Sequence, residues 1–262
     1  MSSPLHVVRA GTVGPPLILC HGSATDASTW TIQVASPLTS RYRVVAYDRR
    51  GAGRSPRAPG VAWHTIEEHA ADLAALIGEL GAPALVVGSS CGAAVVLETC
   101  RRAPAVVRGA ILIEPPLAPS DAAPAVPAGF LAELDRLAVE VGPEAAAERF
   151  LITVLGQAAW DRLPKLFRAR AASTWPQIRG DCYALDAYQV RYPSLAAIDV
   201  PIRLLGGDRS AAYFRPTLEA LAAALPRATL AIVAGAGHML HADAPRAFAD
   251  HVDALAAATA TA

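Results

Sequence analysis

The stretch VVGSSCGAA, residues 86–94, holds three candidate nucleophiles side by side. A nucleophile on a sharp turn between a strand and a helix has strained backbone angles, and the residues two before and two after it must be small because they pack against each other. Only Ser90 fits this turn, since Gly88 and Gly92 occupy those two positions and give the pattern G-x-S-x-G. A glycine-rich turn without chemistry is the alternative. The pattern predicts that Ser90 is a nucleophile.

The residues on either side of this turn agree with it. Ala84–Val87 is a short apolar run, typical of a strand that is buried on both faces of a sheet. Residues 91–97 fit a helix with small side chains on one side, which can lie close to a sheet. The segment therefore predicts a strand, a turn that carries the serine, and a helix.

Composition limits the class of protein. The chain has 262 residues, of which 53% are hydrophobic and 18% charged, so it forms one large core or a core with an inserted subdomain. Its 23 basic and 23 acidic residues cancel, which argues against nucleic acid or an anionic membrane as a partner. We expect a small-molecule substrate, and a monomer or homodimer.

The cysteines and the N-terminus concern metal binding and location. The four cysteines are dispersed, without a C-x-x-C pair or zinc-type spacing, so we expect free, mostly buried thiols and no metal site. The first residues lack the basic and apolar regions of a signal peptide, and no apolar run reaches membrane-spanning length. These features predict a cytoplasmic protein.

Short strand-like runs alternate with helical patterns along most of the chain. The predicted strands are 17–20, 44–47, 84–87, 110–113, 202–205 and 230–233, and helical stretches such as 66–80 and 218–225 separate most of them. Alternation of this kind predicts an α/β fold with a mostly parallel central sheet and helices on both faces.

One long gap interrupts this alternation. Between Glu114 and Pro201 there is no convincing strand, whereas apolar residues recur at helical spacing from Phe130 and again after Pro143, a good first residue for a helix. We expect residues 1–114 and 200–262 to form the core domain. Residues 115–199 form an all-helical insertion, which the Pro- and Ala-rich stretch 115–127 introduces.

Four motifs fall where predicted strands end, the edge at which ligands bind to parallel sheets. They are His21-Gly22, the D-x-R-G-x-G-x-S pattern from 48 to 55, the G-x-S-x-G turn, and the G-x-G-H pattern that ends at His238. In this order they resemble the α/β-hydrolase superfamily over essentially the whole chain apart from the insertion. The insertion resembles the cap that such enzymes carry after the sixth strand. Only one short strand, about 5–9, precedes the His-Gly strand, so we expect the family's first strand to be missing.

The resemblance gives roles to several residues. Serine is a weak nucleophile that needs a base, and His238 is preferred to His241, which we expect to begin the final helix. The oxyanion needs two fixed donors: the backbone N–H of Cys91, directly after the nucleophile, and by resemblance that of Ser23. By resemblance, His21 shapes the oxyanion loop without titrating.

The acid of the triad has two candidates. Families of this fold usually carry it in a G-x-x-D loop after the next-to-last strand, where Asp208 stands one or two residues early. Some relatives place it at the end of the strand before the cap, where this chain has Glu114. Each has a structural alternative, because Asp208 could cap a helix and Glu114 could brace the hinge of the cap. We favour Glu114 and keep Asp208 as the alternative.

The resemblance implies a serine hydrolase that cleaves a carboxylic ester, lactone or related acyl bond of a small, largely apolar substrate, without a metal or organic cofactor. A serine at the turn argues against dehalogenase or epoxide hydrolase activity, since those relatives use aspartate. The alternatives are a carbon–carbon hydrolase, a pathway cyclase, a perhydrolase, or a ligand receptor with the same fold. Aromatic residues of the insertion are expected to roof an apolar pocket or to form its own core: Phe130, Phe150, Trp160, Phe167, Trp175, Tyr183 and Tyr188.

Overall fold

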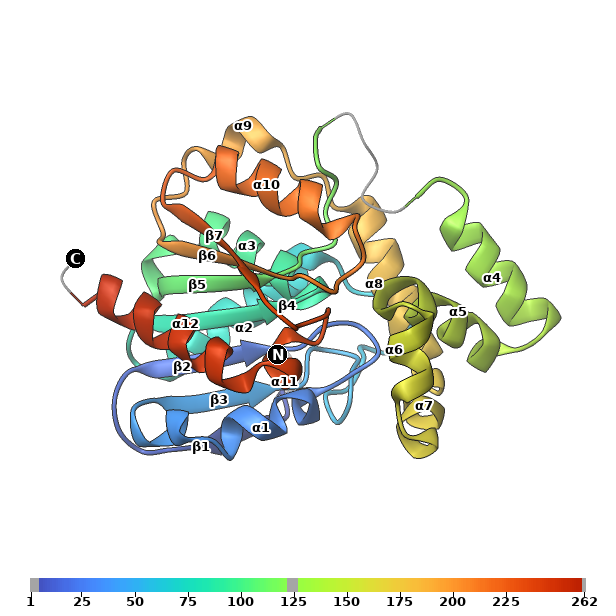
Figure 1. The fold of residues 1–262 in the computed structure, drawn as a ribbon, viewed down its shortest axis with the longest axis horizontal. Helices are drawn as coiled ribbons and strands as arrows, with labels where there is room; N and C mark the ends of the chain where they lie inside the picture. The colour runs from blue at the N-terminus through green and yellow to red at the C-terminus, as the bar shows by residue number, and fades with distance from the viewer. Residues whose placement is uncertain (1–4, 122–126, 261–262) are drawn as a thin grey trace.

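The computed structural model describes residues 5–121 and 127–260, and within these ranges the chain forms one seven-stranded sheet with helices around it (Figure 1). The strands are β1 (Val7–Ala10), β2 (Pro16–Cys20), β3 (Arg43–Tyr47), β4 (Ala84–Ser89), β5 (Val107–Ile113), β6 (Ile202–Gly207) and β7 (Ala228–Val233). Their order in the sheet is β1-β3-β2-β4-β5-β6-β7.

The sheet is parallel except at one edge. Strands β2 to β7 pair in parallel, whereas β1 runs antiparallel to β3, with Val7 opposite Tyr47. The six strands predicted from apolar runs are all present. The short strand expected at about 5–9 is β1, which begins two residues later and covers the sheet edge.

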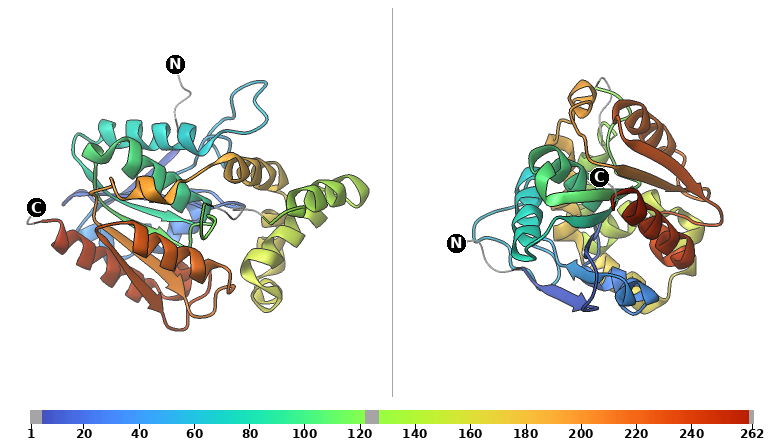
Figure 2. Two further views of the ribbon diagram at one scale, coloured as in Figure 1. Left: turned by 90° about the horizontal axis from the view of Figure 1, so that it is seen from above. Right: turned by 90° about the vertical axis from the view of Figure 1, so that its left-hand side faces the viewer.

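Helices cover both faces of the sheet, as the alternation predicted (Figure 2). The core helices are α1 (Thr31–Val34), α2 (Ile66–Glu79), α3 (Cys91–Arg102), α10 (Phe214–Ala224), α11 (Leu240–Asp243) and α12 (Pro245–Ala258). In β2, Ile18 and Cys20 belong to the apolar cluster that includes residues of α2, α3 and α10, whereas Leu17 and Leu19 belong to a second cluster that includes residues of α12. Successive side chains of a strand point to opposite faces, so a fully apolar strand needs helices on both sides.

The insertion between β5 and β6 has helices and loops but no strand in its described residues, 114–121 and 127–201. Its helices are α4 (Phe130–Glu140), α5 (Pro143–Leu155), α6 (Gln157–Arg162), α7 (Lys165–Ala172), α8 (Trp175–Ala187) and α9 (Tyr192–Leu195). Helices α4 to α8 form a cap beyond one end of the sheet (Figure 1). Of the introducing stretch 115–127, residues 122–126 lie outside the described part.

The cap has small apolar clusters of its own. Leu134, Ala147 and Ile178 are buried where α4, α5 and α8 meet, and Trp160 is buried where α5, α6 and α7 meet. The helices of the insertion therefore pack on one another as well as on the core. Among the described residues, no helix combines the length and apolarity needed to cross a bilayer. All four cysteines are free and buried, as expected.

Candidate active site

Ser90 lies at the turn between β4 and α3, with backbone angles of φ 55° and ψ −126°. Few residues other than glycine adopt a positive φ, and such strain persists only where the surroundings enforce it. Here the Ser90 N–H donates to the Ile113 carbonyl oxygen at 2.8 Å, which fixes the turn to the neighbouring strand. The side chain of Ser90 lines the main cavity of the molecule. A strained, anchored serine that faces a cavity is arranged for attack on a bound molecule.

The two glycines of the turn are required by close backbone contacts. A Cβ atom on Gly88 would collide with the carbonyl of Gly92, and a Cβ on Gly92 would lie 2.5 Å from the carbonyl oxygen of His21. Backbone atoms cannot yield as a flexible side chain can. The spacing of the two glycines therefore reflects the packing of α3 against β4 and β2.

Gly92→Ala should destabilise the fold, because the added methyl group overlaps two carbonyl oxygens of the strand end. Overpacking of this kind costs about 1–3 kcal/mol. Urea unfolding followed by circular dichroism measures the loss. Gly60→Ala is the matched control for an added methyl group in open space, although its φ of +76° adds some backbone strain. Equal stability of Gly92→Ala and the unchanged protein would contradict the packing argument.

Glu114 and His238 form a short, buried hydrogen bond. Glu114 is the first residue after β5, is 1% exposed, and has a positive φ of 44°. Its Oε2 lies 2.6 Å from Nδ1 of His238, and its Oε1 accepts a hydrogen bond from the Gly207 N–H at 2.8 Å. Both carboxylate oxygens are thus engaged, and the carboxylate fixes the orientation of the imidazole ring. Ser90 and His238 line the same cavity.

Asp208, the alternative acid, is directed elsewhere. Its Oδ1 accepts a hydrogen bond from the Gly235 N–H at 2.8 Å, and the residue is exposed. Among the described residues, no hydrogen bond joins Asp208 to His238. Asp208 also does not cap the next helix, since α10 begins only at Phe214 and has no side-chain cap. It ties together the loops that follow β6 and β7.

His238 has an aromatic neighbour, and the rival histidine is enclosed. The ring of Phe214 stacks on that of His238 at 4.5 Å between centroids and 10° between planes. His241 is fully buried beside Trp30, and burial lowers its pKa to about 3, so it stays neutral at ordinary pH. The expectation that His241 begins the final helix is wrong: it lies in the short α11, and α12 begins at Pro245.

Two backbone amides near Ser90 have no acceptor within the described part of the chain. Among the described residues, neither the Ser23 N–H nor the Cys91 N–H donates a hydrogen bond to another protein group. Cys91 is the first residue of α3, and the first N–H groups of a helix have no partner within it. The loop that carries Ser23 lies against Ser90, since a Cβ on Gly22 would come within 2.9 Å of the Ser90 Cβ. Both amides are therefore free for an oxygen atom bound beside Ser90.

The cavity above Ser90 has a volume of about 730 Å³ and lies between the core and the cap. Its roof is mostly apolar and comes from α5 to α7 and their loops: Phe150, Leu151, Val154, Leu155, Trp160, Leu163 and Phe167. Arg162, Arg209 and Asp243 contribute charged side chains to its wall. A cavity of this size and lining suits a small, largely apolar organic molecule.

The aromatic residues of the insertion take the two expected roles, lining the cavity and packing within the cap, and a third role as hydrogen-bond donors. Phe150, Trp160 and Phe167 line the cavity, whereas Trp175 is buried in the core of the cap. The two tyrosines serve as hydrogen-bond donors instead: Tyr183 donates to Asp135 and Tyr188 to Glu98. Because all of these residues are aromatic and lie on helices of similar pattern, only the packing of the helices separates one role from the other.

Several residues of the site were not singled out in the sequence. Phe214 opens a helix that carries no motif, so nothing local indicates its stacking on His238. Asp181, buried on α8, forms an ion pair with Arg49, which follows β3. An isolated aspartate within an amphipathic helix is usually exposed, and its burial depends on a partner 132 residues away in the chain. The arginine itself lies within the motif from 48 to 55.

Comparison with known proteins establishes the family. A model of the alpha/beta hydrolase family matches residues 17–251, and the chain belongs to this family. An uncharacterized hydrolase of Bacillus subtilis is 40% identical over 103 residues, which cover 39% of this chain and 38% of that protein. Epoxide hydrolase A of Mycobacterium tuberculosis is 39% identical over 94 residues, 35% of this chain and 29% of that protein. The matched parts thus span well under half the length of these relatives.

A solved structure matches over nearly the full length. The enol-lactonase from Burkholderia xenovorans LB400 superimposes with a TM-score of 0.81 and 26% identity, covering 97% of this chain and 96% of that one. The similarity includes the cap as well as the core. The protein is therefore an α/β hydrolase with a helical cap over the carboxyl ends of its strands.

Proposed function

We propose that the protein is a serine hydrolase that cleaves an ester, lactone or related acyl bond of a small, largely apolar substrate through an acyl-enzyme. The observation that carries this proposal is the buried 2.6 Å hydrogen bond between Glu114 and His238, beside a cavity that both His238 and Ser90 line. This combination matches a triad of nucleophile, base and orienting acid.

In the proposed reaction, the Nδ1–H of His238 donates a hydrogen bond to the Glu114 carboxylate, which leaves Nε2 free to act as the base. Nε2 takes the proton of the Ser90 hydroxyl while Oγ forms a bond to the acyl carbon, and the carbonyl oxygen becomes an oxyanion. The protonated ring then gives its proton to the leaving alkoxide, and the acyl-enzyme remains. Water then attacks the acyl-enzyme through the same steps, with His238 as the base, and the carboxylic acid product is released.

The Ser23 and Cys91 amides are the proposed donors to the oxyanion. Two N–H groups fixed beside the nucleophile stabilise charge that develops only during the reaction, and such donors are among the largest contributions to catalysis. Their lack of acceptors among residues 5–121 and 127–260 supports this role. Every step uses groups of the chain itself, so the proposal includes no metal or organic cofactor.

Steady-state kinetics on p-nitrophenyl esters of increasing chain length test the proposal. We expect turnover with a pre-steady-state burst of p-nitrophenol, because the acyl-enzyme forms before it is hydrolysed. A lactone series, followed by proton release, tests cyclic substrates. Tight binding of these compounds without turnover would contradict the proposal and favour a receptor with the same fold.

The roof of the cavity is expected to set the preferred acyl length. Val154→Trp places an indole beside Leu151 and Leu155 on the same stretch of α5, so it should raise KM for long-chain esters several-fold and leave acetate esters nearly unchanged. Val139→Trp on α4 is the control, because Val139 is 88% exposed. A parallel change for all chain lengths would show that long substrates bind elsewhere.

A further inference from the structure

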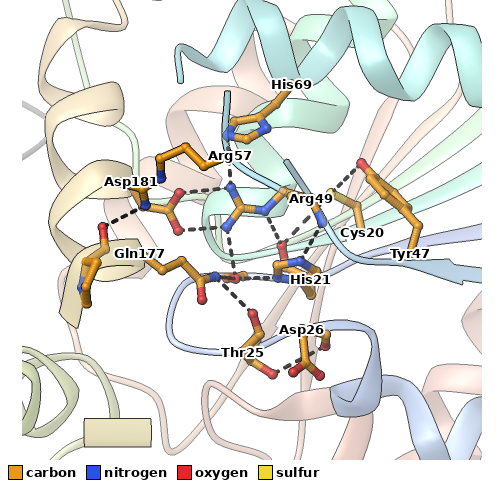
Figure 3. Close-up of polar contacts among 12 residues, drawn as sticks. Cys20, His21, Thr25, Asp26, Tyr47, Arg49, Arg57, His69, Gln177 and Asp181 are labelled. Atoms are coloured by element: carbon orange, nitrogen blue, oxygen red, sulfur yellow. Dashed lines mark hydrogen bonds and ion pairs between the residues drawn. The ribbon is translucent and has the colours of Figure 1, made fainter. Parts of the chain in front are cut away.

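The carbonyl oxygen of Gly22 has three donors, two close ones inside the core and a longer one from Nε2 of Gln177 on α8 at 3.5 Å. Nη2 of Arg49 donates to it at 3.0 Å, and Nδ1 of His21 lies 2.7 Å from it (Figure 3). This carbonyl belongs to the same planar peptide unit as the Ser23 N–H, and in a trans peptide the two groups point in opposite directions. Whatever holds the Gly22 carbonyl therefore aims the Ser23 N–H.

The state of His21 is fixed by its surroundings. Nε2 accepts a hydrogen bond from the Arg49 backbone N–H at 2.9 Å, so the proton of the neutral ring lies on Nδ1, which donates to Gly22. Burial, and next the charge of Arg49, lower the pKa of His21 to about 3. The ring is neutral at ordinary pH and, through its two hydrogen bonds, holds the loop after β2 against the loop after β3.

Arg49 is in turn held by the cap. Its Nη1 and Nη2 donate to the two carboxylate oxygens of Asp181 at 2.9 and 2.7 Å, and the two side chains are only 1% and 7% exposed. A paired, planar geometry of this kind orients the guanidinium group more strictly than a single contact does. Nε of Arg49 donates to the His21 carbonyl at 3.1 Å as well. The guanidinium thus joins helix α8 to the loop that follows β2.

A second residue of α8 contacts the same loop. Gln177 lies one helical turn before Asp181, so both side chains leave the same face of α8. Its Nε2 donates to the Thr25 carbonyl at 2.9 Å (Figure 3). Burial raises the pKa of Asp181, but the charge and the hydrogen bonds of Arg49, with smaller contributions from His69 and Ser23, together outweigh it, and the net shift is downward. The carboxylate therefore stays charged and balances Arg49 at neutral pH.

We propose that Arg49 and Asp181 are positioning residues. They couple the packing of the cap helix α8 on the core to the orientation of the Gly22–Ser23 peptide, and so direct the Ser23 N–H at the oxyanion. The inference rests on the proposed function, since it takes that amide as an oxyanion donor. It links the cap to catalysis, because the Ser23 N–H is aligned only when α8 packs against the core. The cap then contributes to the transition state as well as to the roof of the cavity.

The test removes both partners of the ion pair. Arg49→Met combined with Asp181→Leu leaves no unpaired buried charge, and such double replacements often preserve stability. Losing an oxyanion donor costs roughly 10²–10³ in kcat, so a misaligned one should lower kcat by about 10–100-fold. KM should change by no more than about two-fold, because the roof that binds the substrate is intact. Affinity for an alkyl boronic acid, whose adduct on Ser90 places an oxygen at the oxyanion position, should fall with kcat.

The matched control breaks a different ion pair of the same helix. Arg179 on α8 pairs with Asp135 on α4 at 2.7 Å, away from the loop that carries Ser23. Arg179→Met with Asp135→Leu should leave kcat and boronic acid affinity within about two-fold. If the Arg49 and Asp181 double variant does not fold, Asp181→Asn and Gln177→Leu replace it, with a smaller loss of kcat expected in each. An unchanged kcat in these folded variants would overturn the inference.

Hydrogen exchange of the His21 Nδ1–H, which donates to the Gly22 carbonyl inside the core, gives a readout that does not depend on activity. Faster exchange of this proton in the Arg49 and Asp181 variant, and not in the Arg179 and Asp135 variant, is the expected result. A wild-type protein without ester turnover or Ser90 labelling would contradict the proposed function, while the exchange result still decides whether the ion pair orders this peptide. Unchanged exchange would overturn the positioning role.

Discussion

Ser90→Ala is expected to abolish ester turnover, with kcat lower by several orders of magnitude and the fold unchanged. Loss of the nucleophile leaves only the rate that binding and the oxyanion donors supply. A fluorophosphonate should form one covalent adduct with the native protein, which tryptic mass spectrometry should locate on Ser90. The variant should form none. Circular dichroism and thermal unfolding check that the variant is folded.

Ser89→Ala is the matched control, because it removes a hydroxyl from the adjacent position. We expect turnover within a few-fold of the native protein and an unchanged adduct on Ser90. An adduct on Ser89 or Cys91 would show that the turn presents another side chain. Burial already raises the pKa of the Cys91 thiol well above its usual value, so a thiolate is not available there.

Glu114→Gln should lower kcat by roughly 10⁴-fold, since a neutral amide cannot stabilise the imidazolium or hold the ring in the required tautomer. The substitution keeps the size of the side chain and its hydrogen bond from the Gly207 N–H. KM should change little, because Glu114 is buried behind His238. Stopped-flow measurement of acylation isolates the step in which His238 acts as the base.

Asp208→Asn serves as the control on the other candidate acid. Its carboxylate holds the Gly235 amide, and asparagine retains an oxygen for that bond, so we expect a few-fold change at most. The reverse result, a large loss for Asp208→Asn and a small one for Glu114→Gln, would assign the acid to the loop after β6. Two modest losses would show that another group orients His238.

Local patterns were sufficient to predict the sheet. Each parallel strand is a run of apolar residues, because helices cover both faces of the sheet. Such a run can be recognised from the local sequence alone. The turn at Ser90 could be predicted because Gly88 contacts Gly92 four residues later, whereas the contact of Gly92 with the end of β2 is not visible in the local sequence. The helical character of the insertion followed from spacing alone.

Other features depend on contacts between distant segments. Both candidate acids follow a strand and precede His238 in the chain, and only the three-dimensional arrangement brings Glu114 to the imidazole while Asp208 turns to Gly235. The ion pair between Asp181 and Arg49 joins the cap to the core, so no local sequence pattern predicts it. The start of α12 was misplaced because Pro245 begins a new helix just after the short α11.

In the proposed triad, the position of Glu114 at the end of β5 has a consequence for the evolution and engineering of this protein. Where the acid follows β6, the loop there must keep its length and shape to hold a carboxylate against the histidine. In this chain residues 209–213 do not hold the proposed acid against the histidine, yet Arg209 lines the wall of the cavity. This loop can therefore vary in sequence while the proton-transfer groups stay in place, and a randomised library limited to it would search for new substrate preferences at little risk to reactivity.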